Sequence, residues 1–116
     1  MNEIKIEKSE LDVDGFYDIQ FNILSPMAII KCSMYIFEDE IEELKNNLQL
    51  MYEKKLNRFI FKYDAVGLRD NIMLEFVLID NDNVKINYNI TNEDSIFKSN
   101  IIANLENIYN FKINIK

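Results

Sequence analysis

The chain has 116 residues, of which 48% are hydrophobic and 12% aromatic, and its formal net charge is −7 at pH 7. This composition excludes an intrinsically disordered chain, and no apolar run is long enough to cross a membrane. The 13 Lys and Arg residues do not cluster, which argues against nucleic-acid binding, and the length predicts a single domain over residues 1–116.

The N-terminal third predicts strands. Residues 4–8 can form a short first strand, and residues 16–24 alternate apolar and polar side chains as a half-buried strand does. Ser25 and Pro26 end that strand, because proline cannot donate to a β-ladder. A further strand follows over residues 27–37. Its predicted inward row consists of Ala28, Ile30, Cys32, Met34 and Ile36.

Residues 38–56 change to the three-and-four spacing of an amphipathic helix. Asp39 is the expected N-cap, and Lys54 and Lys55 fall in the expected last turn. The beginning of this helix is strongly acidic. The charge complements the helix dipole, and it can also serve as a patch that binds a partner. The acidic residues are Glu38, Asp39, Glu40, Glu42 and Glu43.

The second half predicts three antiparallel strands and a closing helix. A strand over 58–65 is followed by a turn at Gly67 and by a hairpin over 71–91, whose first arm reads as covered on nearly both faces. A helix is expected over residues 96–110, and residues 111–116 form either a terminal strand or a tail. The predicted fold is therefore α+β in the order β-β-α-β-β-β-α. In it, two helices pack on one face of a curved antiparallel sheet of five to seven strands.

Two single residues stand out as candidates for partner binding. Glu75 interrupts an apolar strand, so it is exposed on an open sheet face, or buried and paired with Arg58, Lys62 or Arg69, or used in binding. Tyr35 lies on the less apolar side of its strand, where a tyrosine can anchor an interface because it buries a large area with little loss of rotamer freedom.

The chain offers little reactive chemistry. It has no His, so it lacks the usual general base and the commonest transition-metal ligand. Its one Cys and two Gly cannot supply a CxxC metal site or a glycine-rich phosphate loop. We therefore expect no enzyme, cofactor or metal. The single Cys and the absence of a visible signal peptide favour the cytoplasm.

The order of these segments resembles the WapI-type immunity proteins of polymorphic and contact-dependent toxin systems. The resemblance covers residues 16–110 and is carried by FYDIQFNI, AIIKCSMYIF, LKNNLQLMYEKKL, RFIFKY, MLEFVLIDNDNVKINYNI and EDSIFKSNIIANLENIY. It implies a non-enzymatic bacterial protein that binds and neutralises the toxic domain of a cognate effector. The acidic balance of the chain suits a basic toxin, without contact to nucleic acid or membrane.

Two alternatives remain open from the sequence. The first is a small homodimeric binding or assembly module that pairs through a strand edge or a sheet face. The second is an enzyme that works with carboxylates alone, for which Asp80 and Asp82 in the hairpin turn are the first candidates.

Overall fold

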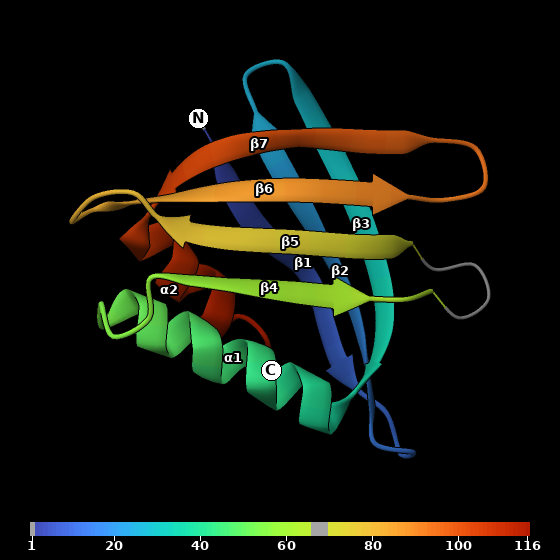
Figure 1. Ribbon diagram of the computed structural model, residues 1–116. Helices are drawn as coiled ribbons and strands as arrows, with labels where there is room; N and C mark the ends of the chain where they lie inside the picture. Colours follow the sequence, from blue (N-terminus) through green and yellow to red (C-terminus); the bar gives the residue numbers. More distant parts are fainter. Residues whose placement is uncertain (1, 66–69) are drawn as a thin grey trace.

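The computed structural model describes residues 2–65 and 70–116, which form two antiparallel sheets and two helices (Figure 1). The α+β class is confirmed, but the strands form two sheets instead of one curved sheet. The first sheet contains β1 (Glu3–Leu11), β2 (Phe16–Ser25) and β3 (Ala28–Phe37). The second contains β4 (Arg58–Tyr63), β5 (Asn71–Leu78), β6 (Asn83–Thr91) and β7 (Ile96–Asn104), and the helices are α1 (Glu38–Tyr52) and α2 (Leu105–Ile113).

The two sheets lie face to face with their strands crossing at a steep angle, and they enclose the core (Figure 1). Every second side chain of β2, β3, β5 and β6 points into this space, as the two-residue period of a strand requires. Cys32 is part of this row, but Ala28 is exposed, so the inward row begins at Ile30. The buried residues of the sheets and helices form one hydrophobic cluster.

Both helices lie along one open side of the sandwich. Helix α1 contacts β2 and β3 of the first sheet and β4 of the second, while α2 contacts β1, β6 and β7. The helices therefore do not cover one face of a sheet as predicted, and in the described part of the chain no helix lies on the outer face of either sheet. No helix in the described part of the chain has the length and apolar character that crossing a membrane requires.

The central hairpin is covered on one face only. In β5, Ile72, Leu74 and Phe76 are buried, whereas Met73 and Val77 on the opposite face are partly exposed. The prediction of a strand covered on both sides is therefore wrong, because only the first sheet and the helices pack against the inner face. The predicted turn at Gly67 and the possible partner Arg69 lie outside the described residues.

The C-terminal segment differs most from the prediction. Residues 96–104 form β7 instead of the first half of a helix. They follow β6 through a tight hairpin and pair with it, so their backbone groups extend the sheet by one strand. Asn92 makes this turn, since its side-chain oxygen accepts the N–H groups of Asp94 and Ser95. The helix begins only at Leu105, after the N-cap Asn104, and residues 111–116 complete it and form the tail.

Helix α1 is shorter than predicted and begins one residue earlier than its expected cap. Its N-cap is Phe37, which provides no side-chain hydrogen bond, so the assignment of Asp39 as N-cap is wrong. The helix ends at Tyr52, because Lys54 adopts a positive φ of 61° that terminates it. Lys54 and Lys55 thus lie beyond the helix and not in its last turn.

Candidate protein-binding surface

The turn between β1 and β2 is built around Asp12. Its Oδ1 accepts the N–H groups of Asp14 at 2.9 Å and Phe16 at 3.0 Å. Gly15 has a φ of 86°, which an L side chain rarely adopts, so glycine is needed at this position. The Gly15 carbonyl oxygen accepts the N–H of Glu38 at 3.2 Å. This bond joins the turn to the first residue of α1.

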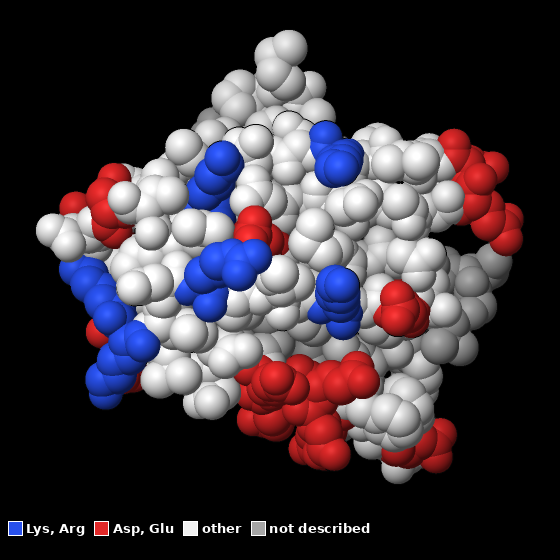
Figure 2. Space-filling model, viewed as in Figure 1, with Lys and Arg blue, Asp and Glu red and all other residues white. Residues whose placement is uncertain are grey.

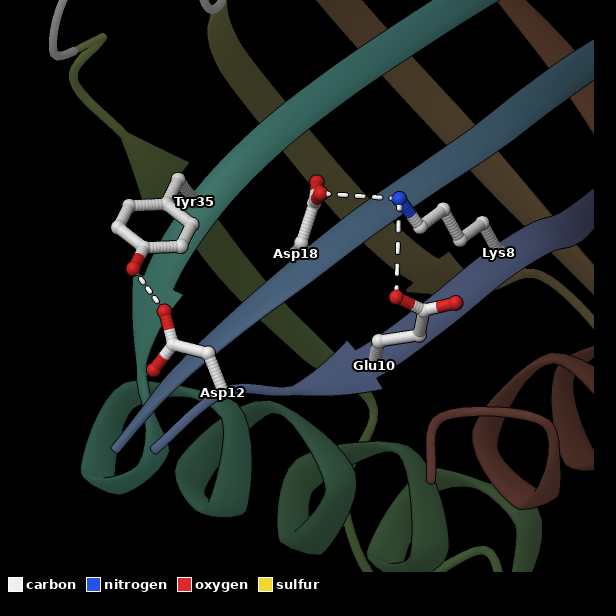
Figure 3. A network of polar contacts seen from close by, with 5 residues as sticks. All are labelled: Lys8, Glu10, Asp12, Asp18 and Tyr35. Carbon is white, nitrogen blue, oxygen red and sulfur yellow. Dashed lines mark hydrogen bonds and ion pairs between the residues drawn. The ribbon is translucent and has the colours of Figure 1, made fainter. Parts of the chain in front are cut away.

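Tyr35 is held in place beside this turn (Figure 3). Its hydroxyl donates to the Asp12 carboxylate, and its ring stacks on Phe16 with centroids 4.6 Å apart and planes inclined by 7°. Phe16 also stacks on Phe37, its partner across the β2–β3 ladder, at 3.9 Å. Three aromatic rings on adjacent strands thus form a fixed cluster, and Phe37 is 54% exposed.

The hydrogen bond between Tyr35 and Asp12 shifts the pKa values of the two side chains in opposite directions. Together with burial and the charges of Asp12, Asp14 and Asp18, it raises the pKa of Tyr35 to about 12. The same bond and the Phe16 N–H lower the pKa of Asp12. At neutral pH the phenol is therefore protonated and the carboxylate is charged, which is the combination that keeps the hydrogen bond in place.

Carboxylates surround this aromatic cluster. We call the acidic end the surface formed by residues 12–18, Tyr35, Phe37 and the first two turns of α1. Lys8 lies at its border, with its ammonium 3.1 Å from Asp18 and 3.7 Å from Glu10 (Figure 3). Figure 2 shows acidic side chains gathered over the beginning of α1. Burial raises the pKa of Tyr17, and the negative charges of Glu38 and Glu42 raise it further.

The structure brings most of the predicted binding residues together. Tyr35 and the exposed residues of the α1 start, which are Glu38, Asp39, Glu40 and Glu42, belong to the acidic end. Glu43 also lies in the first two turns of α1, on the flank that faces β4. Asp12 and Phe16 are not among the binding residues predicted from the sequence. The alternating pattern of residues 16–24 places Phe16 and Tyr17 on opposite faces of the strand. Only the strand register shows that Phe16 lies opposite Phe37.

Glu75 lies elsewhere, on the outer face of the second sheet. One of its carboxylate oxygens is 2.5 Å from Nη2 of Arg58, and the other accepts from the Asn87 amide at 2.7 Å. The hydrogen bonds from Asn87 and Arg58 lower the pKa of Glu75. The residue is thus partly buried and paired with Arg58, and it does not contribute to the acidic end.

The outer face around Glu75 carries positive charge. Arg58 and Lys85 lie in one cross-strand row, and Lys62 and Lys98 lie in another, with Glu75 in the row between them. Figure 2 shows basic side chains spread over the second sheet, above the acidic side chains at the start of α1. The molecule is therefore electrostatically polarised, although its net charge is −7.

The remaining candidates for chemistry have structural partners. Cys32 is buried, and its burial raises the pKa of the thiol to about 12, so it packs as a neutral side chain. Asp80 accepts the N–H groups of Asp82 and Asn83 in the hairpin turn. Among residues 2–65 and 70–116, no group of three or more potential metal ligands is found.

Comparison of the chain with models of protein families, with curated proteins and with solved structures found no match.

Proposed function

We propose that this chain is a non-enzymatic immunity protein that binds and neutralises a cognate, basic bacterial toxin domain in the cytoplasm. The observation that carries the proposal is the acidic end, where Asp12, Tyr35 and the start of α1 form one surface. Such a surface offers charge for recognition and ordered aromatic rings for contact, and neither function requires turnover.

The two properties act at different stages of binding. Exposed carboxylates attract a basic surface over a distance of about 10 Å at moderate salt, which accelerates encounter. The stacked rings of Phe16, Tyr35 and Phe37 lose little freedom on contact because they are already fixed by their neighbours. Capture over a basic active site would exclude a polyanionic substrate from the toxin, since substrate and inhibitor compete for the same positive charge.

The experiment uses the toxin domain encoded beside the gene for this chain. We expect co-expression to protect cells and the two proteins to purify together. Replacing Glu38 and Glu40 with Gln should slow association at least tenfold at low salt, by reducing electrostatic steering. The matched control replaces Glu93 with Gln and Asp94 with Asn, two residues that are also exposed and lie in the β6–β7 turn. Absence of protection, or an equal effect of both double variants, contradicts the proposal.

A second candidate function, a homodimeric module, is favoured by the open edge of β7. Ile96, Phe97 and Ile102 are 74%, 42% and 47% exposed there. Antiparallel pairing of two copies about Ser99 would set Ile96 against Ile102 and Lys98 against Asn100, without opposing like charges. Sedimentation should then give twice the mass of the chain, and Asn100→Pro should restore the monomer. A monomeric wild type at high concentration excludes this candidate.

A further inference from the structure

Among the described residues, no strand pairs with the outer edge of β4. β4 is the terminal strand of the second sheet, and the Leu78 N–H donates to the Asn57 carbonyl oxygen at 2.8 Å. In an antiparallel ladder every second residue of a strand bonds to the same neighbouring strand. Because Asn57 bonds toward β5, the backbone groups of Phe59 and Phe61 also bond to β5. The backbone N–H and C=O groups of Ile60 and Lys62 then point away from the sheet, and no hydrogen bond to another described residue is found for them.

A groove runs between this edge and α1. One hollow of about 210 Å³ is lined by Glu40, Glu43, Leu44 and Asn47 of α1 and by residues 59–62 of β4. It continues into a second hollow of about 390 Å³, because Glu40 and Lys62 line both. The second hollow ends at the aromatic cluster of Phe16, Tyr35 and Phe37. In Figure 1, α1 runs beneath the length of β4, beside this edge.

The groove arises from the way α1 packs. The helix turns Ile41, Leu44 and Leu48 into the core. Glu40, Glu43 and Asn47 follow at three- and four-residue spacing on the flank that faces β4, so the helix presents polar side chains to the open strand edge. An unpaired ladder edge on one side and carboxylates on the other are the two features that an added strand of basic sequence requires.

We propose that this groove receives an extended basic segment of the partner as a fifth strand of the second sheet, paired with β4. This inference rests on the proposed function and names the chemistry by which the toxin is held. Backbone bonds to Ile60 and Lys62 fix the segment, and Lys or Arg side chains at alternate positions reach Glu40 and Glu43. Its end contacts the rings of Phe16 and Phe37, which joins the groove to the acidic end.

The other strand edges are less suited to this role. The Tyr63 hydroxyl and the Asp70 carboxylate bond to the outer edge of β3, and the Asn107 amide bonds to that of β1. The edge of β7 is open, but the only charged residue within β7 is Lys98. At β4 the groove carboxylates Glu40, Glu43 and Asp64 outnumber Lys62, and Arg58 is paired with Glu75. A basic strand therefore meets net negative charge at β4 and only the positive charge of Lys98 within β7.

The test uses a seven-residue peptide of alternating Lys and Val, capped at both ends, and a matched peptide in which Glu replaces Lys. We expect the Lys peptide to shift the amide NMR signals of Ile60 and Lys62 and the Glu peptide to leave them unchanged. Ile60→Pro should weaken binding of the Lys peptide about tenfold, since it removes an N–H that the added strand needs.

Two control variants make this result specific. Asn100→Pro removes the equivalent outward N–H on β7 and should bind the Lys peptide as the wild type does. Ile60→Thr keeps the N–H while removing the aliphatic side chain, and it should lose less than threefold. Equal binding by Ile60→Pro and wild type, with the fold checked by circular dichroism, overturns the inference.

The outcomes separate this inference from the proposed function. Toxin capture that survives in Ile60→Pro keeps the immunity function and rejects the groove. Peptide binding at β4 without any toxin capture keeps the groove and rejects the immunity function. Binding of both peptides with equal strength also rejects the inference, because it leaves no role for Glu40 and Glu43.

Discussion

The Tyr63 hydroxyl takes the place of a peptide group opposite Tyr35. It accepts the Tyr35 N–H at 3.0 Å and donates to the Tyr35 carbonyl oxygen at 3.1 Å. Tyr63 belongs to β4 and Tyr35 to β3, so one side chain closes the edge of the first sheet and joins it to the second. The residue that carries the aromatic cluster is thereby fixed on its backbone as well as through its hydroxyl.

Removing this hydroxyl should destabilise the protein. Tyr63→Phe removes both of these hydrogen bonds to the partly buried Tyr35 backbone, so we expect a loss of about 1–3 kcal/mol in the free energy of unfolding. Urea denaturation measures it. Tyr88→Phe is the control, because Tyr88 is equally buried and no hydrogen bond from its hydroxyl to a described residue is found. Equal effects of the two variants would contradict the role of Tyr63.

Asn107 performs the same task at the opposite edge. Its side chain accepts the N–H of Ile4 and donates to the carbonyl oxygen of Ile4, both at 3.0 Å, which connects α2 to β1. Asn107→Ala should lower the free energy of unfolding by about 1–3 kcal/mol, and amide exchange at Ile4 should accelerate. Asn110→Ala, on the exposed side of the same helix, should change neither. Unchanged exchange at Ile4 would contradict this assignment.

The Tyr35 phenol should ionise at a higher pH than an ordinary tyrosine. Because its pKa is raised to about 12, its contribution to stability is present below the usual value of 10 and is lost as pH rises through 12. Subtracting the ultraviolet titration of Tyr35→Phe from that of the wild type should isolate this ionisation. In Asp12→Asn the midpoint should move back toward 10. Circular dichroism at each pH establishes that the protein is folded, and a midpoint near 10 in folded wild type would contradict the hydrogen bond.

Glu75 should stabilise the protein in a pH-dependent manner. Its pKa is lowered in the folded state, so its contribution is present above the unfolded pKa of about 4.3 and disappears as pH falls through the folded value. Glu75→Gln should therefore reduce Tm at pH 7, and the difference from wild type should vanish in acid. Thermal unfolding at a series of pH values measures this, with Glu93→Gln as the exposed control. A difference that stays constant with pH would argue against the pair with Arg58.

The sequence alone determined the elements with regular local patterns. The alternation that predicts strands over residues 16–24 and 58–65, and the three-and-four spacing of Ile41, Leu44 and Leu48, each fit one secondary structure, because one face of the segment must be buried. The second of these strands ends at Tyr63, two residues earlier than predicted. The pattern of residues 96–104 does not select one secondary structure in this way. Their apolar side chains fit a helix as well as a strand, and the choice depends on the unpaired edge of β6, which no local pattern reports.

The sequence also determined that charge is concentrated at the start of α1 and that Tyr35 lies beside Phe37 on one strand face. Only the tertiary structure decided that Asp12 and Phe16 join them and that Glu75 does not. Strand register and the Gly15 to Glu38 hydrogen bond bring these segments together, whereas Glu75 pairs with Arg58 on the other sheet. Contacts between segments that are distant in the chain depend on how the sheets pack, so spacing along the sequence cannot specify them.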